Sequence, residues 1–171
     1  MKSVYAAAFT LLLAAAPALA QTASDPSGFG GLSTQAGEQV SITADALEIV
    51  EDENTALFTG NVLIIQGTME MRAPQVLAVY GEGGPGDLEN FTASGGRVHM
   101  VFDDQTTESD EAFYDFSSRT LTLTGNVVVV NASGTVESAR LVIDTRAGTS
   151  SFSGGAGGGG RVTGVFTPGG G

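Results

Sequence analysis

The side chains best suited to bond chemistry in this sequence are its neighbouring acids. Carboxylates stand side by side at Asp103–Asp104 and at Asp110–Glu111, and residues 51–53 read Glu-Asp-Glu. Two carboxyl groups that flank a sugar can cleave a glycosidic bond, so a carbohydrate-active enzyme is one reading of these pairs. The pairs fall in predicted turns, where solvated acids are the ordinary finding. The sequence therefore favours a protein that is not an enzyme.

Other chemical motifs are incomplete. His99 is the only histidine and cysteine is absent, whereas a zinc site needs three or four ligands. Residues 81–86 match Gly-x-Gly-x-x-Gly, but a predicted strand follows instead of the helix that a dinucleotide site requires. No serine stands in a Gly-x-Ser-x-Gly elbow. We expect no catalytic residue, no metal site and no cofactor.

The charge balance narrows the choice of partners. Nineteen acidic residues stand against seven basic ones, which gives a formal net charge of −12. Such a chain lacks the basic patch that nucleic acids require, and it is not drawn to anionic membrane surfaces. Any anionic lipid must therefore be held mainly through its apolar part.

Residues 1–20 have the features of a cleavable export signal. Lys2 gives a positive start, residues 4–16 form an apolar run, and Ala18-Leu19-Ala20 offers small residues around a cleavage point. The run is shorter than the roughly 20 apolar residues that span a bilayer. We expect cleavage after Ala20 and export to the bacterial periplasm.

The rest of the chain is predicted to form one domain. Residues 21–38 are rich in Gly, Ser, Thr and Ala and predict a flexible lead-in. The domain is expected over residues 39–168, followed by a short glycine tail at residues 169–171. Because the chain has no cysteine, its stability cannot come from disulfides.

The hydropathy pattern of the domain is that of β-strands. Apolar residues alternate with polar ones, and Gly, Asn and Asp bound the alternating segments. We expect a dozen or more short strands and no substantial helix. In the apolar runs at residues 62–65 and 127–130, alternation does not tell which side chains face inward.

The chain also repeats itself at an offset of 65 residues. Thr59-Gly60-Asn61-Val62 recurs as Thr124-Gly125-Asn126-Val127, and Asp45 recurs as Asp110. Repeated short strands stack so that each unit buries one face against its neighbours. Two copies are too few for a long solenoid and favour a two-sheet jellyroll.

These repeats carry a resemblance to a known family. The first copy resembles the LptA/OstA family of lipopolysaccharide transport proteins at residues 42–45, 57–62 and 66–71. The second copy resembles that family at residues 114–115 and 123–127, and its closing strands at residues 152–153 and 161–163. The similarity covers nearly the whole predicted domain.

The resemblance implies a fold, a function and partners. The implied fold is all-β, a twisted, slightly open antiparallel β-jellyroll of two facing sheets. The implied function is that of a periplasmic carrier that shields the acyl chains of lipopolysaccharide in an apolar groove. The implied partners are lipid A, an LptC-like inner-membrane protein, an LptD-like outer-membrane protein and further copies of the chain, stacked head to tail.

Seven residues are expected to contact lipid. Motif matching within the family suggests five of them, and Met69 and Met71 are added because methionine adapts to irregular apolar surfaces. The five are Val40, Ile42, Val98, Tyr114 and Phe116. Two apolar residues two positions apart point to the same face of a strand, as a groove lining requires.

A structural or adhesive β-repeat protein with a filled core and no lipid ligand is the alternative, because inward apolar residues usually just pack. Two features depart from the family: the scarcity of lysine, and the glycine-rich segment at residues 154–160. The sequence leaves open the chemistry of the lipid headgroup, the number of units in a bridge, and which end meets which partner.

Overall fold

The computed structural model describes residues 38–84, 86–155 and 160–167. The predicted export signal at 1–20, the lead-in up to residue 37 and the glycine tail at 169–171 lie outside the described residues. The described residues form twelve strands and one short 3-10 turn, η1 (Glu51–Glu53). The strands are β1 (Val40–Thr43), β2 (Ala46–Val50), β3 (Thr55–Gln66), β4 (Met69–Tyr80), β5 (Leu88–Ser94), β6 (Val98–Phe102), β7 (Gln105–Ser109), β8 (Glu111–Asp115), β9 (Thr120–Asn131), β10 (Gly134–Asp144), β11 (Thr149–Ser153) and β12 (Thr163–Phe166).

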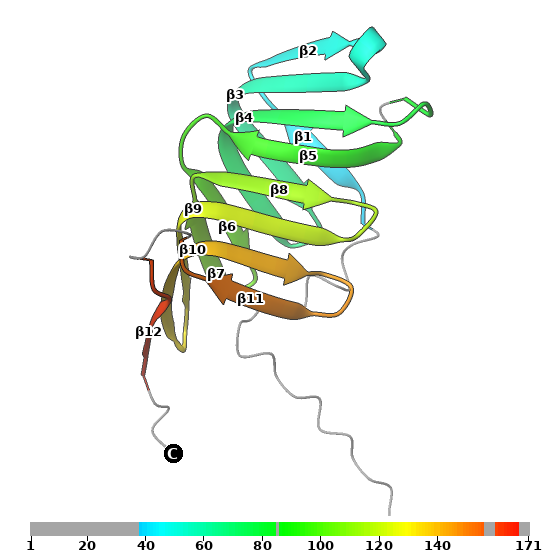
Figure 1. Ribbon diagram of the computed structural model, residues 1–171. Coiled ribbons are helices and arrows are strands. Elements are labelled where there is room, and N and C mark those ends of the chain that lie inside the picture. The colour runs from blue at the N-terminus through cyan, green and yellow to red at the C-terminus, as the bar shows by residue number, and fades with distance from the viewer. Residues whose placement is uncertain (1–37, 85, 156–159, 168–171) are drawn as a thin grey trace, which may run out of the picture.

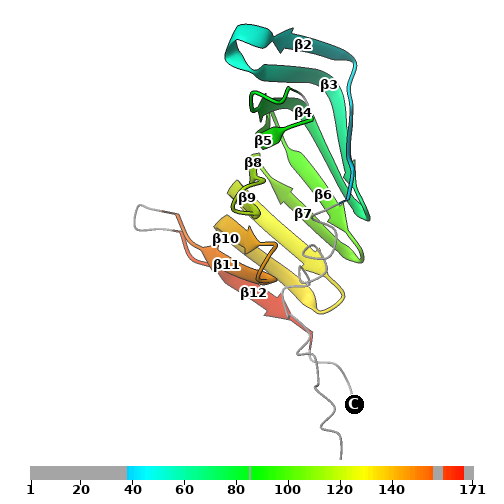
Figure 2. The same cartoon turned by 90° about the vertical axis from the view of Figure 1, so that its right-hand side faces the viewer.

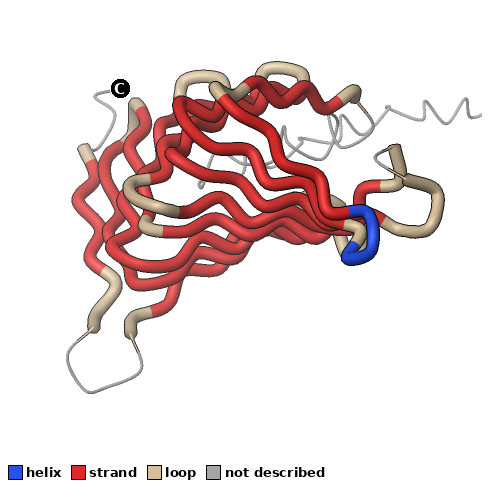
Figure 3. The backbone as a smooth tube through the Cα atoms, turned by 90° about the horizontal axis from the view of Figure 1, so that it is seen from above, coloured by secondary structure: helices blue, strands red, loops and turns tan. Residues whose placement is uncertain are grey.

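Four long strands, β3, β4, β9 and β10, run through both layers of the molecule. One half of each long strand lies in one layer and the other half in the second layer, where each half is completed by short strands. The first layer has the order β2-β3-β4-β5-β8-β9-β10-β11. The other layer has the order β1-β3-β4-β6-β7-β9-β10-β12. All pairs are antiparallel, and Figure 3 shows the two layers from above, spread apart like the arms of a V. The predicted all-β jellyroll is confirmed.

The repeated Thr-Gly-Asn motif is the place where the long strands bend. The pairing of β3 with β4 shifts register between Thr59 and Val62, and Gly60 and Asn61 between them have φ of 77° and 46°. Gly125 and Asn126 in β9 have φ of 76° and 45°. A bulge of this kind bends a strand and needs left-handed backbone, which Gly and Asn tolerate best.

One aspartate closes each bend. The Asp45 amide donates to the Gly60 carbonyl at 2.9 Å, and its carboxylate accepts from the Asn61 side-chain amide at 2.7 Å. Asp110 makes the corresponding bonds to Gly125 and Asn126 at 2.9 and 2.8 Å. A side chain on Gly60 or Gly125 would collide with the carboxylate of its aspartate. Each bend therefore requires glycine for two reasons, its positive φ and the lack of space for a Cβ atom.

The 65-residue repeat is a repeat of structure. Adding 65 to the bounds of β1 to β4 gives β7 to β10, with only one residue of difference at some ends, and β6 corresponds to β12 in the same way. The two copies therefore lie side by side in one stack of strands (Figure 1). Because they are equivalent, a residue in one copy can be compared directly with its counterpart in the other.

The structure decides the direction of the apolar runs. Val62 and Ile64 are buried while Ile65 is exposed, and Val127 and Val129 are buried while Val130 is exposed. Successive strand residues face opposite sides, so the buried set of each run faces the space between the layers.

The connections before β5 and before β7 bear on turns predicted from the sequence. In the described part of the segment after β4, the Gly84 amide donates to the Gly81 carbonyl and the Asp87 amide to the Gly84 carbonyl, and the strand that follows, β5, begins at Leu88. Asp103 and Asp104 form a turn, as the sequence predicts, and Gln105 directly after them is the first residue of β7. Strand β7 has no apolar residue, and hydropathy therefore could not reveal it.

Both ends of the stack present strand edges. Strands β1 and β2 lie at one end, and β11 and β12 lie at the other (Figures 1 and 2). Apolar side chains are exposed on these outermost strands: Leu47 and Ile49 on β2, and Val165 and Phe166 on β12. Exposed edges with apolar side chains favour pairing with another chain.

Candidate functional site

The inward faces of both layers form one continuous apolar cluster. Its members come from both layers and from both copies of the repeat, and the largest fully buried ones include Phe102, Met71, Met100, Leu121 and Leu141. Such an interior stabilises the fold through burial of apolar area, at roughly 25 cal/mol per Å². It is also the only environment in the described part of the chain suited to a hydrocarbon.

Half-buried apolar side chains form a rim around this cluster. Val40 and Ile42 belong to β1 at one end of the stack, and Phe152 belongs to β11 at the other. Leu88 and Phe116 lie at strand ends of the first layer, away from the bends. Apolar side chains that pack against the cluster are therefore partly exposed at both ends of the stack and along one side.

All seven residues predicted to contact lipid belong to this interior or its rim. Met69, Met71, Val98 and Tyr114 are buried in the cluster, and the others are half-buried against it. The structure thus brings together residues from β1, β4, β6 and β8 that are far apart in the sequence. Their contact with lipid stays a prediction.

Three aromatic rings pack together where the rim of the first layer meets the buried cluster: Phe116 is half-buried, and Phe91 and Tyr114 are buried. The ring centroids of Tyr114 and Phe116 are 4.7 Å apart, and Phe91 lies 5.7 and 6.1 Å from them. The Tyr114 hydroxyl lies 3.5 Å from the Thr145 hydroxyl, which in turn donates to the Arg119 carbonyl at 2.8 Å. Phe116 packs edge-to-face on both other rings, a geometry that aromatic pairs prefer.

A surface hollow of about 520 Å³ opens beside these rings. Its lining includes Leu88, Phe116 and three acidic residues, Asp87, Glu89 and Asp115. The pKa of the Asp115 carboxyl is lowered, because the amide of Ser118 and the hydroxyl of Ser117 donate hydrogen bonds to it. This part of the rim thus pairs apolar rings with negative charge.

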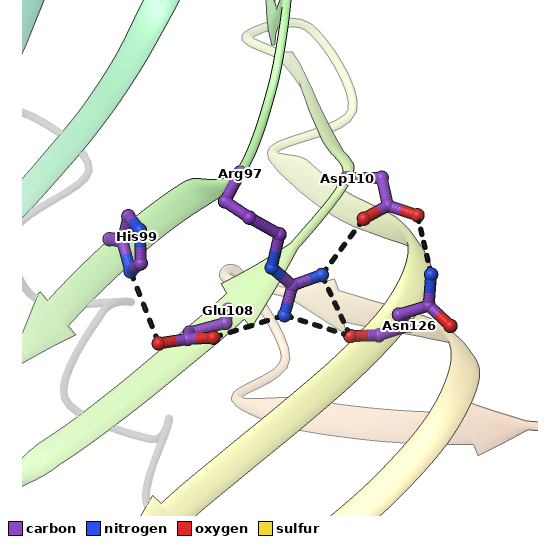
Figure 4. Close-up of polar contacts among 5 residues, drawn as sticks. All are labelled: Arg97, His99, Glu108, Asp110 and Asn126. Atoms are coloured by element: carbon purple, nitrogen blue, oxygen red, sulfur yellow. Dashed lines mark hydrogen bonds and ion pairs between the residues drawn. The ribbon is translucent and has the colours of Figure 1, made fainter.

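A polar network fixes the second bend from outside (Figure 4). Arg97 donates to Asp110 at 2.9 Å, to Glu108 at 3.1 Å and to the Asn126 carbonyl at 3.2 Å. His99 Nδ1 lies 3.3 Å from Glu108. Hydrogen bonding to Asp110 raises the pKa of Arg97, and hydrogen bonding from Arg97 lowers the pKa of Glu108.

This network, which we call the Arg97 clamp, joins neighbouring strands. It ties β6, β7 and the bend of β9 together through one guanidinium, whose planar fork suits several acceptors at once. The acidic pair Asp110–Glu111 is thereby explained in part, because Asp110 orders the bend. Among the described residues, no group of three or more His, Cys, Asp or Glu side chains is arranged to hold a metal ion.

Sequence reasoning missed one feature of the interior. Gln105, Thr107 and Ser109 of β7 point inward and are buried, at 1%, 2% and 1% exposure. The signal that could have found them is the repeat, because the same offset of 65 places them at the positions of Val40, Ile42 and Ala44.

Within the described ranges, no helix has the length and apolar character to cross a bilayer.

Comparison with known proteins agrees with this architecture. Among solved structures, LptH of Pseudomonas aeruginosa, described as the LptA-homologous periplasmic component of its lipopolysaccharide transport device, superposes with a TM-score of 0.65 at 19% sequence identity. The match covers 78% of this chain and 99% of LptH. At this level of identity the likeness shows the fold.

Sequence comparison is more specific. An uncharacterized protein of Rhizobium meliloti (strain 1021) is 30% identical over 125 residues, which are 70% of this chain and 66% of that protein, just under two thirds of its length. Residues 41–149 match the family described as LptA/(LptD N-terminal domain) LPS transport protein. This match takes in most of the strands of both copies of the repeat, so the chain belongs to the LptA/LptD N-terminal domain family of lipopolysaccharide transport proteins.

Proposed function

We propose that this protein is a periplasmic carrier that shields the acyl chains of lipopolysaccharide between its two layers. Membership of a transport family supports a carrier over an enzyme. The observation that carries the proposal is the apolar interior whose rim, including Val40, Ile42 and Phe116, stays half-buried at both ends and along one side. These partly exposed apolar side chains offer hydrocarbon its first contact with the interior.

The energetics suit a ligand held by its tails. Burial of hydrocarbon contributes about 0.8 kcal/mol per CH₂ group, so several acyl chains can hold a lipid without help from charge. The formal net charge of −12 offers little attraction to a phosphorylated headgroup. The centre of the interior is filled by the protein's own side chains, with Ile64, Met71 and Leu141 at 0% exposure. Uptake of a lipid therefore requires the layers to spread along the open side.

The two ends of the stack support a bridge of several units. An open edge at one end of each layer, β2 or β1, can pair with the opposite edge, β11 or β12, of the next copy. Such strand addition continues both layers and the apolar interior from unit to unit. A contact of this type does not close on itself and makes filaments. LptC-like and LptD-like membrane proteins would pair with the two ends in the same manner.

Placement in the periplasm rests on the export signal predicted at residues 1–20 and on the family. The related LptH is described as a periplasmic component. N-terminal sequencing of the protein purified from periplasmic extract would test the expected cleavage after Ala20.

Photo-crosslinking tests the carrier directly. A benzoylphenylalanine at Ile42 or Phe116, on the rim, should form adducts with purified lipopolysaccharide. The matched control is Phe113, which lies on β8 like Tyr114 but faces outward and is 37% exposed. Adducts at the two rim positions and none at Phe113 would support the carrier. Equal labelling at all three, or none at the rim, would leave a β-repeat scaffold with a filled core.

A further inference from the structure

Strand β7 carries three polar side chains into the apolar interior. Gln105, Thr107 and Ser109 are each at least 98% buried. The Gln105 side-chain nitrogen and the hydroxyls of Thr107 and Ser109 have no hydrogen-bond partner. The Gln105 side-chain oxygen has one distant partner, the Asn131 amide at 3.5 Å. We call Gln105, Thr107 and Ser109 the polar row.

The surroundings of the polar row are apolar. Its cross-strand neighbours on β6 are Phe102, Met100 and Val98, and Thr107 also pairs with Val129 on β9. All four of these neighbours are buried. A buried polar group without a partner destabilises a protein by about 1–3 kcal/mol. The row therefore weakens the empty protein, and its presence needs a reason other than stability.

The first copy of the repeat shows that the fold does not require this polarity. The residues equivalent to Gln105, Thr107 and Ser109 are Val40, Ile42 and Ala44, which are apolar and pack against the core. Ala44 and Ser109 differ by a single oxygen atom. Apolar side chains are thus compatible with the strand geometry, and at these three positions only the second copy places hydrogen-bonding groups inside.

The polar row extends along the whole inward face of β7. Ser109 adjoins the bend, where the amide of Asp110 bonds to Gly125, and Gln105 adjoins the turn at the far end of β7. Alternate residues of a strand are spaced by about 7 Å. The three polar groups therefore follow one another from the turn before β7 to the bend, where a chain held between the layers after they spread would run past them.

We propose that the polar row hydrogen-bonds hydroxyl groups on bound acyl chains, so that the second copy of the repeat selects hydroxylated acyl chains over plain ones. The inference rests on the proposed function and specifies its ligand. The hydroxyls of Thr107 and Ser109 both donate and accept, and the Gln105 nitrogen donates. A chain hydroxyl can satisfy such groups, whereas a plain methylene chain leaves them all unpaired.

The test compares two free fatty acids of equal length, myristic acid and 3-hydroxymyristic acid, as competitors of a fluorescent fatty acid bound to the purified protein. The wild type should bind the hydroxylated acid about 3- to 10-fold more tightly, the effect of one net hydrogen bond. The double variant Thr107→Val and Ser109→Ala removes two of the three polar groups, so it should lose most of this preference and keep its affinity for myristic acid. Thr106→Val, on the outward face of the same strand, is the matched control and should keep the discrimination.

A second measurement separates recognition from folding. Without ligand, the double variant should melt at or above the temperature of the wild type, because it loses two unpaired buried groups. Lipopolysaccharide crosslinking at Ile42 and Phe116 reports on the carrier itself.

Equal binding of the two acids by the wild type, or an undiminished preference for the hydroxylated acid in the double variant, would overturn the inference while the carrier function stands. Failure of both acids and of lipopolysaccharide to bind would overturn the carrier function, and the inference with it.

Discussion

At the scale of single residues, the aspartates of the two bends differ in one hydrogen-bond partner. Asp45 and Asp110 both hold the asparagine and glycine of their bend. Among the described contacts, only Asp110 also receives a guanidinium, that of Arg97. This extra contact lies where β6 and β7 join the bend of β9, in the middle of the stack. The first bend lies near the end of the stack.

Replacing Arg97 by glutamine should lower the melting temperature at pH 7 by about 2–4 °C, a typical shift for a protein of this size. The variant removes the charged donor to Asp110 and Glu108. The control is Arg72→Gln, which removes an ion pair with Glu70 on the outer surface and should change little. Equal effects of the two substitutions would contradict the clamp.

The difference in melting temperature between the wild type and Arg97→Gln should depend on pH. Arg97 lowers the pKa of Glu108 in the folded state. A carboxyl with a lowered folded pKa stabilises the protein above its unfolded pKa of about 4.3, and this contribution is lost as pH falls through the lower, folded pKa. The melting difference between wild type and Arg97→Gln should therefore shrink from pH 7 to pH 3. Thermal melts across this range measure it, and a constant difference would contradict it.

At the scale of elements, the bent long strand is the unit that makes two layers from one hydrogen-bonded sheet. Each of β3 and β9 changes layer at a Gly-Asn pair with positive φ. The bend also turns the inward side chains on both halves of the strand toward the same space, as burial of Ala56 and Val62 on β3 shows. A straight strand would leave the two layers in one plane with no interior.

Gly125→Ala should destabilise the protein by about 1–3 kcal/mol, as expected for a strained non-glycine residue. Its φ is 76°, and a Cβ there would collide with Asp110. The matched control is Gly84→Ala, at φ 81° with open space around the Cβ, which carries the backbone strain without the collision. Urea unfolding should show the larger loss for Gly125→Ala. Similar losses would mean that Asp110 does not restrict the bend.

At the scale of the whole molecule, the open ends of the stack decide how copies meet. Strand β2 exposes Leu47 and Ile49, at 52% and 48%, and β12 exposes Val165 and Phe166, at 66% and 62%. These apolar side chains lie on the outermost strands, where a second copy would add its own edge. Assembly in this manner extends the interior that the proposed carrier requires.

The wild type should therefore form larger species as its concentration rises, measured by light scattering. Ile49→Lys and Val165→Lys should each shift the protein toward the monomer, because a charge on an edge strand opposes pairing. Val101→Lys is the control: this side chain is 38% exposed, but β6 is paired on both sides. A monomer at every concentration, or equal effects of all three substitutions, would contradict end-to-end assembly.

Local sequence patterns predict much of this architecture. Alternation, as at Val98 and Met100, predicts strands because successive side chains face opposite sides. The Thr-Gly-Asn repeat indicates two copies because Gly and Asn supply positive φ at little strain. The apolar residues of the candidate site could be named from their spacing and from the family they resemble.

Tertiary structure decided what local pattern could not. The runs at residues 62–65 and 127–130 are apolar throughout, and only pairing with a partner strand selects the face that is buried. The strand β7 has no hydropathy signal, and its side chains become interior groups solely because β6 and β9 pair on its two sides. Burial depends on neighbours distant in sequence. The burial of Gln105, Thr107 and Ser109 could therefore be seen only in the tertiary structure.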